Sequence, residues 1–562
     1  MLRITEIKLP LITSAETGHT DAEIKAALVK KLAINAADII NFSIVKRGVD
    51  GRKSHAILFV YSLDVVVNGE AKLLAKLARD PHVKPAPDTD YKFVANFLPP
   101  PQPSPLNGEG VRIKSPPVIV GFGPAGIFAA LILAQAGFKP IVLERGKAVR
   151  ERTKDTFNFW RKNELNAESN VQFGEGGAGT FSDGKLWSQI KDPKHYGRKV
   201  LQEFVAAGAP PEIMYVSHPH IGTFRLVGMV ETMRKTIESL GGKIHFESRV
   251  DDIEIANNEV KAVVLASGER IATNHLILAV GHSARDTFEM IYKKGIFIEA
   301  KPFSIGFRIE HPQSLIDKAR YGNSYNEDLL SKLGSAEYKL VHHASNGRSV
   351  YSFCMCPGGT VVAAASEIGR VVTNGMSQYS RNERNANAGI VVGITPEVDY
   401  PAEFNEYGPL AGMQLQRDLE SNAYVLGGSS YAAPAQLIGD FLNNVTSTKF
   451  GEVVPSYTPS VHLTNLNTAL PEFAINAIRE AIPAFAKQIK GYDLADGLLT
   501  GVETRTSAPI RIKRDSDTLE SINTKGLYPC GEGAGYAGGI LSAGVDGIRV
   551  AELVSLSLTY KA

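Results

Sequence analysis

The sequence predicts an α/β protein with a doubly wound, Rossmann-type domain, a β-rich inserted domain and an N-terminal ferredoxin-like α+β domain. The chain of 562 residues is long enough for about two or three hydrophobic cores. Clustered prolines separate residues 1–97 from the rest and predict a linker over 98–117, because they stop helices and central strands. A strand, a glycine-rich turn, a helix and a second strand follow directly, as in a Rossmann-type βαβ unit.

Residues 1–97 carry the signals of a small β-α-β-β unit. The opening segment LRITEIKLP alternates as a strand does, and Thr20 followed by Glu23 forms a capping box that begins a helix. Residues 37–48 and 54–67 are rich in β-branched and aromatic side chains and predict two further strands. This order of elements is the basis for expecting a ferredoxin-like domain.

The segment from Val118 to Glu144 has every part of a dinucleotide-binding unit. Its glycines, Gly121, Gly123 and Gly126, permit a tight turn, close approach of the backbone to a pyrophosphate and close packing of helix on strand. The helix N-terminus would hold the phosphate. The second strand ends in Glu144, where a carboxylate can accept hydrogen bonds from a ribose. The sequence therefore predicts a nucleotide site.

Two further segments have the same glycine spacing, FGEGGAGTFSDGKL at 173–186 and CGEGAGYAGGI at 530–540. The first leads to no apolar helix, and the second has no following strand that ends in an acid. One nucleotide contacted by several loops explains the three segments better than three nucleotides do.

Together with Glu144-Arg145-Gly146 and the turn Ala279-Val280-Gly281, these motifs resemble the FAD-binding proteins of the glutathione-reductase superfamily. More closely, nearly the whole chain is similar to a family of FAD-dependent proteins described as NAD(FAD)-utilizing dehydrogenases. Further segments that support the second resemblance are FCMCPGGTVVAAASE, TNGMS and GVETRTSAPIRI.

The resemblance implies that FAD is held by residues from several parts of the chain. The residues implied are Gly121, Gly123, Pro124, Ala125 and Gly126 at the pyrophosphate, Glu144 and Arg145 at the adenosine ribose, Gly179, Thr180, Ser182 and Lys185 in a loop over the cofactor, Val250 at the adenine, Gly281 at the second strand-end turn, Gly531 and Glu532 at the ribitol, and Gly539 and Ile540 at the start of a helix aimed at the flavin.

From this we expect the FAD-binding domain to comprise residues 112–185, 223–285 and 499–562. Residues 186–222 and 286–498 would form the inserted substrate domain, or lid. Strand-like runs in the longer insert, such as FSIGFRI and AGIVVGI, predict a mixed or antiparallel sheet.

The expected function is that of an FAD-dependent oxidoreductase, a dehydrogenase or reductase that transfers hydride or electrons between FAD and a small-molecule substrate. The sequence has no second complete Rossmann unit, so NADH or NADPH would bind transiently, or another electron donor would serve. The alternative is a flavoprotein that supports nucleic-acid modification or partner binding through its N-terminal domain.

The composition gives this alternative no support. The formal net charge is +2, which provides no electrostatic reason to expect nucleic acid as the main partner.

We expect no membrane partner, because no window reaches about 18 uninterrupted apolar residues, and no secretion signal is apparent. Three cysteines suit the reducing cytoplasm better than a disulfide framework. The sequence gives no indication of the oligomeric state.

The candidate catalytic residues are Cys354, Cys356 and Arg505. On an extended strand the two cysteines share one face, Pro357-Gly358-Gly359 would form a turn, and GTVVAAAS would return as the partner strand. A disulfide would be strained there, because Cα atoms two residues apart on a strand are about 6.6 Å apart. No metal site is expected, since His342 and His343 face opposite ways and no C-x2-C pair is present.

These cysteines are therefore either functional thiols near the flavin or small residues that line a tight cavity or hairpin. Arg505 likewise has two interpretations. It could orient an anionic substrate or an FAD phosphate, or it could pair with acidic residues of the lid.

Overall fold

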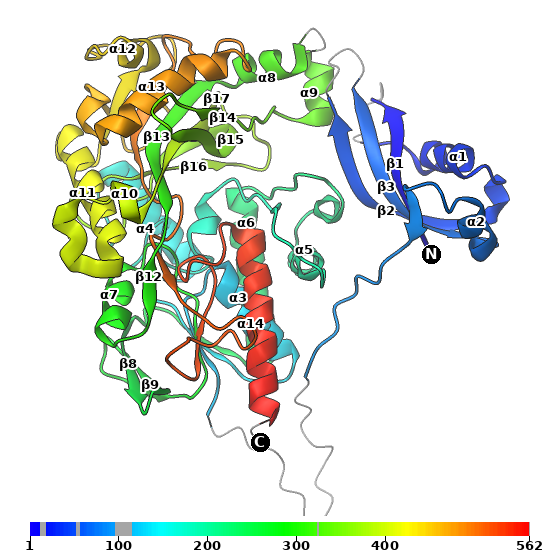
Figure 1. Ribbon diagram of the computed structural model, residues 1–562, viewed down its shortest axis with the longest axis horizontal. Coiled ribbons are helices and arrows are strands. Elements are labelled where there is room, and N and C mark those ends of the chain that lie inside the picture. Colours follow the sequence, from blue (N-terminus) through cyan, green and yellow to red (C-terminus); the bar gives the residue numbers. More distant parts are fainter. Residues whose placement is uncertain (12–17, 52–56, 96–114, 323–324, 561–562) are drawn as a thin grey trace, which may run out of the picture.

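The computed structural model describes residues 1–11, 18–51, 57–95, 115–322 and 325–560. The predicted linker lies largely outside these residues. Figure 1 shows a small N-terminal unit beside a larger body, whose lower part contains α3 and α14 and whose upper part contains α8, α12 and α13. In the described part of the chain, no helix combines the length and the apolarity needed to cross a bilayer.

The N-terminal unit is a four-stranded antiparallel sheet of order β2-β3-β1-β4. This order and the alternation of strands and helices are those of a ferredoxin-like βαββαβ unit. The capping box of Thr20 and Glu23 is present at the start of α1. The elements are β1 (Leu2–Pro10), α1 (Asp21–Leu32), the 3-10 turn η1 (Ala36–Asp38), β2 (Ile39–Asp50), β3 (Leu58–Val67), α2 (Glu70–Lys76) and β4 (Val83–Pro85).

The lower part of the body is built on a five-stranded parallel sheet of order β22-β11-β5-β6-β7. All five strands are short, and the three central ones are almost fully apolar, as expected for a sheet covered on both faces. The strands are β5 (Val118–Val120), β6 (Ile141–Leu143), β7 (Lys243–His245), β11 (Leu276–Leu278) and β22 (Leu527–Pro529).

The two faces of this sheet are covered differently, which departs from the doubly wound prediction. On one face, Ile119, Val142 and Ile277 pack in one core with helices α3, α5, α6 and α14. On the other, Val118 and Leu278 pack mainly against a three-stranded antiparallel sheet, β8 to β10, and helix α7. The elements are α3 (Pro124–Gln135), α5 (Tyr196–Ala206), α6 (Thr223–Ser239), α7 (Arg285–Lys293), α14 (Ile540–Tyr560), β8 (Val250–Ala256), β9 (Glu259–Leu265) and β10 (Arg270–Ala272).

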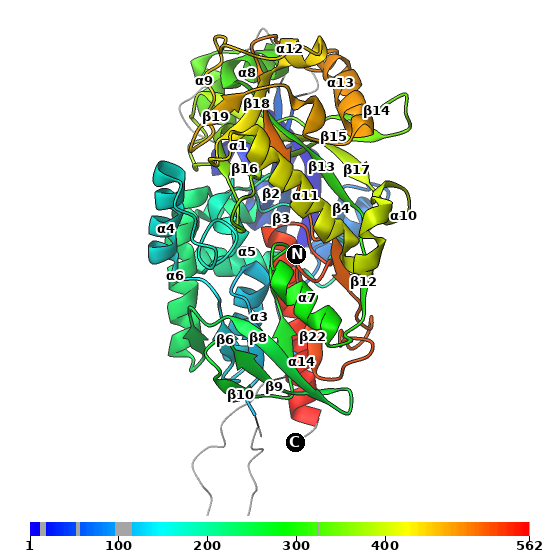
Figure 2. The ribbon, with the colours of Figure 1, turned by 90° about the vertical axis from the view of Figure 1, so that its left-hand side faces the viewer.

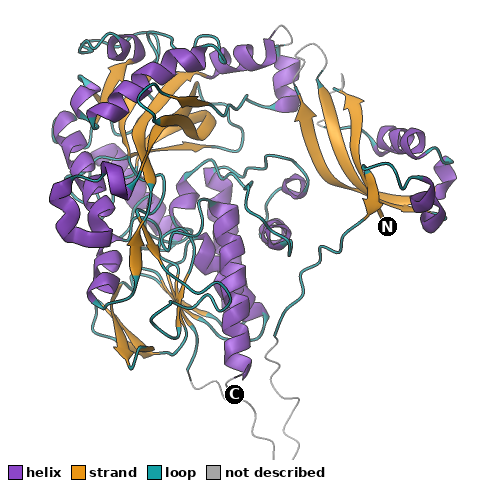
Figure 3. Ribbon diagram, viewed as in Figure 1, coloured by secondary structure: helices purple, strands orange, loops and turns teal. Residues whose placement is uncertain are grey.

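The upper part is a mixed sheet of order β14-β15-β17-β13-β20-β18-β19, with β16 paired to β15. Figure 3 shows its strands gathered in the upper part, under a cover of helices, and Figure 2 shows α11 and α13 lying over it from the side. The strands are β13 (Phe303–Pro312), β14 (Val341–His343), β15 (Ser349–Ala363), β16 (Thr373–Ser377), β17 (Asn385–Ile394), β18 (Ala433–Leu437), β19 (Val461–Leu463) and β20 (Leu498–Glu503).

The helices of the upper part come from the same insert. They are α8 (Gln313–Tyr321), α9 (Glu327–Leu333), α10 (Pro396–Asp399), α11 (Ala411–Leu426), α12 (Ile438–Leu442) and α13 (Glu472–Ala486), with 3-10 turns at η5 (Ala402–Leu410) and η6 (Leu466–Thr468). Remaining elements of the body are α4 (Val149–Lys162), the 3-10 turns η2 (Ala178–Phe181) and η3 (Pro211–Met214), β12 (Ile298–Ala300) and β21 (Ile510–Ile512).

The predicted domain boundaries need three corrections. Residues 186–222 do not join the upper part, because α5 packs in the core of the parallel sheet, against α14. Helix α7 and β12 likewise pack with the lower part. Strand β20 was expected in the FAD-binding domain but pairs with β13 and β18, so residues 498–503 belong to the upper sheet. Each boundary differs from the prediction because the segment packs against elements that are distant in sequence.

The segment YSFCMCPGG does not form a hairpin end. It lies inside one long strand, β15, which continues through Pro357, Gly358 and Gly359. The strand pairs with β17 along its first part and with β16 along its second, and its register with β17 shifts between Phe353 and Cys356 and again before Gly359. The predicted turn is thus wrong: the irregularity is absorbed as bulges, with positive φ at Cys354 and Gly358, while the strand continues.

Candidate cofactor site

A cavity of about 370 Å³ lies at the carboxyl ends of the parallel strands. Val120 and Leu143 end two of these strands, and Ala279 follows a third. Phe353, Cys354 and Asn374 of the upper sheet line it as well. The cavity is therefore enclosed between the two parts of the body, at the edge of an α/β sheet where ligands bind in this class of fold.

The glycine turn at the cavity has the geometry that the spacing predicts. Gly121 has φ +98°, and a Cβ there would lie 2.6 Å from the carbonyl oxygen of Ala279. A Cβ on Gly126 would lie 2.0 Å from the carbonyl oxygen of Gly121, so this glycine allows α3 to pack against the turn. Both positions require glycine because of the protein's own backbone.

Gly123 is different, because a Cβ there would make only an ordinary contact, 3.6 Å from the Cα of Gly177. It lines the cavity and is the N-cap of α3, where no side chain caps the helix. Among the described residues, no side chain thus caps the first amides of α3 at the cavity wall, which is the arrangement that binds phosphate. The residues present fit a dinucleotide pyrophosphate.

Glu144 and Arg145 both line the cavity, and both already have protein partners. The carboxylate of Glu144 is buried and accepts hydrogen bonds from the backbone N–H groups of Phe122, Gly146 and Gly174, at 2.8 to 2.9 Å. These bonds fix its position, and carboxylate oxygens retain further acceptor capacity. The Arg145 guanidinium lies 4.1 Å from the centre of the Phe173 ring and forms ion pairs with acidic neighbours.

Most of the other residues expected at FAD also line the cavity. They are Gly121, Gly123, Pro124, Ala125, Gly179, Ser182, Lys185, Val250, Gly281, Glu532, Gly539 and Ile540. Glu532 is the carboxylate expected at the ribitol. Burial raises its pKa to about 7, with Lys301 acting in the opposite direction.

Three expected residues do not line the cavity and instead shape its walls. Gly126 faces the glycine turn. The hydroxyl of Thr180 is buried and donates to the carbonyl of Glu175 at 3.5 Å. The N–H of Gly531 donates to Asp546 Oδ2 at 2.8 Å, and its φ of +76° turns the chain so that Glu532 reaches the cavity.

Several lining residues were not anticipated. Examples are Trp187, Phe353 and Asn374, which line the cavity but do not belong to the glycine motifs. Asn374 falls within TNGMS, a segment that supported the family resemblance, but no local pattern assigns it to a ligand. The indole N–H of Trp187 is buried and has no hydrogen-bond partner among the described residues.

Arg505 is not part of the cavity wall. Its guanidinium makes a two-fold ion pair with Glu420, with Nε–Oε1 at 2.9 Å and Nη2–Oε2 at 2.7 Å, and it donates to Ser283 and Ser366 as well. The structure thus supports pairing with an acid of the upper part and not a contact to substrate. Arg505 is a structural residue in this arrangement.

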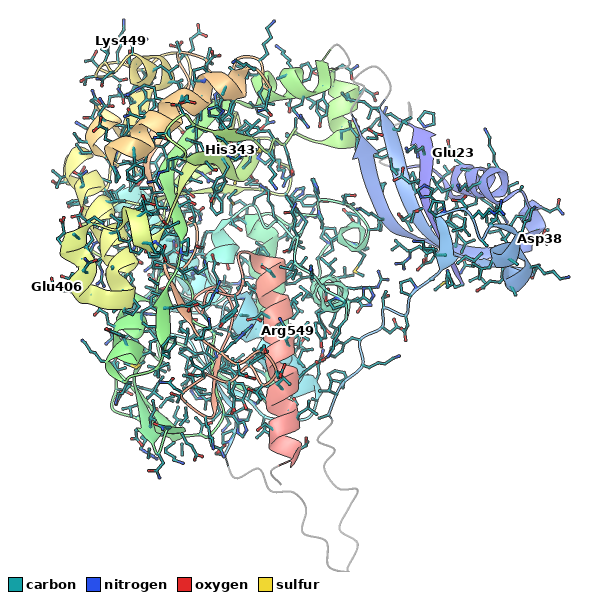
Figure 4. The ribbon with its side chains drawn as sticks, in the orientation of Figure 1. Glu23, Asp38, His343, Glu406, Lys449 and Arg549 are labelled. Carbon is teal, nitrogen blue, oxygen red and sulfur yellow. The ribbon has the colours of Figure 1, made fainter. Side chains whose placement is uncertain are left out.

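Cys356 also lies behind the wall, completely buried, while Cys354 reaches the cavity. All three cysteines are free thiols. The described residues include no cluster of histidine, cysteine or acidic side chains able to hold a metal ion. His343, labelled in the upper part in Figure 4, instead contacts Ser349 at 3.0 Å, and His342 contacts Glu480.

The parallel sheet, its glycine turn and the cavity at the strand ends define the class of dinucleotide-binding proteins with a covering domain. Comparison with known sequences is more specific. Residues 302–506 match the family described as "FAD-dependent protein, C-terminal domain-like". Residues 1–66 match a family described as "Domain of unknown function (DUF8436)".

A protein from Clostridium beijerinckii, named "Uncharacterized protein", is 48% identical over 526 residues, which cover 93% of this chain and 94% of that protein. The chain belongs to the same family as this clostridial protein, and its upper part is of the FAD-dependent type. The match at 302–506 includes β20, in agreement with the corrected boundary.

Solved structures resemble the chain more distantly. An L-proline dehydrogenase from P. horikoshii has 14% identity and a TM-score of 0.32, covering 79% of this chain and 94% of its own. A glycine oxidase from Bacillus cereus has 11% identity and a TM-score of 0.29, covering 79% and 96%. At these scores the likeness says nothing about the substrate of this protein.

Proposed function

We propose that the protein is an FAD-dependent oxidoreductase, a dehydrogenase or reductase of the NAD(FAD)-utilizing type, that acts on a small molecule admitted to the cavity. The observation that supports this most is the composition of the cavity wall. The wall includes the glycine turn and the uncapped N-terminus of α3, and it also includes Phe353, Cys354 and Asn374 of the FAD-dependent domain at 302–506. A cofactor bound at the glycine turn would present its reactive ring to a substrate held by that domain.

In this proposal each part of the wall binds one part of FAD. The turn at Gly121 and Gly123 and the α3 amides hold the pyrophosphate, and Glu144 accepts hydrogen bonds from the adenosine ribose. Val250 lies where a strand's backbone would contact the adenine. Glu532 follows β22 and would bind the ribitol.

FAD supplies the hydride or electron transfer, and the chain positions the substrate and excludes water. Helix α14 begins at Ile540, which lies against Gly179: a Cβ on Gly179 would lie 3.0 Å from Ile540 Cγ1. This contact directs the N-terminus of α14 toward the cavity, where its dipole would favour negative charge on a reduced flavin. Lys185, whose ammonium also donates to the carbonyl of Met355, provides a donor for an anionic or carbonyl-bearing substrate.

The choice of electron donor gives the most direct test. We expect purified protein to contain about one FAD per chain, identified by chromatography after denaturation. In an anaerobic titration, NADH or NADPH should bleach the yellow flavin band, because each is a two-electron donor.

Bound FAD that neither nucleotide bleaches, but that dithionite reduces, would refute the NAD(P)H-linked version and point to a different donor. Protein without any bound flavin, and unable to bind added FAD, would refute the proposal as a whole. Dithionite alone serves as the control, because it reduces flavin without needing a nucleotide site.

A further inference from the structure

We propose that Cys354 and Cys356 form a second two-electron redox centre, a dithiol–disulfide pair that exchanges electrons with FAD across the cavity. This inference rests on the proposed function, since it requires FAD in the cavity. It adds to that function a cysteine pair that passes electrons between the flavin and the substrate side of the cavity.

The two thiols occupy adjacent but unequal positions. Cys354 lines the cavity together with Lys185, Asn374 and Glu532. Cys356 lies directly behind it and is 0% exposed. Its Sγ is 3.4 Å from the carbonyl oxygen of Cys354, so the buried sulfur turns back toward the residue that lines the cavity. One thiol can meet the flavin and the other can only meet its neighbour.

The expectation that a disulfide would be strained assumed the spacing of a regular extended strand, and the backbone at Cys354 is not regular. Cys354 has φ +43°, in the left-handed region that β-strand residues other than glycine rarely adopt. The pairing of β15 with β17 shifts register between Phe353 and Cys356. The regular alternation and spacing of an ideal strand therefore do not hold at this pair. Backbone strain of this kind persists where the surrounding structure maintains it, and it clusters at functional sites.

The charges around the pair favour a thiolate at Cys354 and a thiol at Cys356. Arg308 is fully buried, and its Nη2 donates to the Cys354 carbonyl at 3.0 Å and contacts Cys356 Sγ at 3.6 Å. Lys185 donates to the carbonyl of Met355, between the two cysteines. Interaction with the Cys356 thiol, assisted by Lys185 and Arg308, lowers the pKa of Cys354, and the same interaction raises the pKa of Cys356.

A low-pKa, accessible thiolate beside a protonated partner is the arrangement of an attacking and a resolving cysteine. In the oxidative direction the Cys354 and Cys356 sulfurs form an S–S bond, and the S–H bond of Cys356 breaks. The two electrons and that proton pass to FAD, which is the oxidant. In the reverse direction the reduced flavin returns them, and the S–S bond breaks to give thiolate and thiol.

Electron counting tests this proposal without any substrate. The FAD-loaded, air-oxidised protein should consume about four electrons per FAD in an anaerobic dithionite titration, two for the flavin and two for the disulfide. Cys354→Ser and Cys356→Ser should each consume about two. Cys530→Ala is the matched control, because Cys530 is buried in the core of the parallel sheet, and this variant should still consume four.

A thiol map on the wild-type protein gives a second readout that does not depend on how the variants fold. Arg348 and Arg370 bound a tryptic fragment that contains Cys354 and Cys356 and no other cysteine. After denaturation, this fragment should take up no alkylating reagent from the oxidised protein and two equivalents from the dithionite-reduced protein. Cys530 should be alkylated in both.

Uptake of only two electrons by FAD-containing wild-type protein, or two alkylated cysteines in the oxidised fragment, would overturn the dithiol proposal and leave the flavoprotein proposal standing. Four electrons in Cys354→Ser would also overturn it. Protein that binds no FAD would instead disprove the proposed function, so the two failures are distinguishable.

Discussion

Replacement of Gly123 by valine is expected to abolish retention of FAD during purification. Gly123 is the N-cap of α3 and lines the cavity, so a side chain there would occupy the space in which the backbone approaches a pyrophosphate. We expect the dissociation constant to rise by about 100-fold or more, which corresponds to about 2.8 kcal/mol of binding free energy. Gly123→Ala should weaken FAD binding less than Gly123→Val does.

The measurement is the flavin-to-protein absorbance ratio, followed by titration of apoprotein with FAD. Gly393→Val is the matched control, because a Cβ at Gly393 on β17 meets nothing within 4 Å. It should retain FAD as the wild type does. Thermal unfolding of the two apoproteins separates a lost binding site from a lost fold. Full FAD retention in a folded Gly123→Val protein would contradict the assignment of the pyrophosphate to this turn.

The cofactor side of the cavity was predictable because its determinants are local. A strand, the spacing of Gly121, Gly123 and Gly126, and an apolar helix lie within one short segment. At Gly121 and Gly126 a Cβ would collide with the backbone, so the structure shows directly why glycine is needed there. The capping box at Thr20 follows from equally local rules. Local sequence patterns of this kind predict the local structure correctly because no distant contact opposes them.

The substrate side was not predictable in the same way. Phe353 and Asn374 reach the cavity because β15 and β16 pair in a sheet whose other strands come from distant segments. The assignment of β20 to the upper sheet depends on β13, nearly two hundred residues earlier. The Pro-Gly-Gly of β15 has the composition of a turn, yet the strand continues through it, and Gly359 pairs with both β16 and β17. Tertiary pairing overrode the local signal.

Arg505 illustrates how a partner that is distant in sequence decides between two possible roles of a residue. From the sequence, an arginine shortly before the C-terminal glycine motif fits a ligand contact and an ion pair equally well. The structure brings it to Glu420, 85 positions earlier, on helix α11. Arg285 of the lower part donates to the same carboxylate at 2.7 and 3.0 Å. Glu420 therefore joins residues from three separate segments.

We call the buried ion-pair group of Glu420, Arg285 and Arg505 the junction. Its disruption is expected to give the largest change in stability. Glu420 is 0% exposed, and its two oxygens accept hydrogen bonds from both guanidinium groups and from the hydroxyl of Thr504. Glu420→Gln keeps the shape but removes the charge and leaves two buried cations facing a neutral amide. Breaking a buried pair in this way costs about 3–5 kcal/mol, so we expect the midpoint of urea unfolding to fall markedly.

Asp418→Asn is the matched control: it makes the same chemical change on the same helix, at an exposed position. It should alter stability by less than about 0.5 kcal/mol. An equal effect of the two substitutions would contradict a role for the buried charge, because the loss would then be a property of the helix and not of the junction.

The pH dependence provides an independent check of the same junction. Burial alone would favour the protonated form of Glu420, but Arg285 and Arg505 outweigh it and hold its pKa well below the usual range. A carboxyl with a depressed folded-state pKa stabilises the protein fully above its unfolded pKa, about 4.3, and that contribution is lost as the pH falls toward the folded value. The difference in unfolding midpoint between wild type and Glu420→Gln should therefore be large near neutral pH and shrink below about pH 4. A difference that stayed constant on acidification would show that the charge of Glu420 does not act through the two arginines.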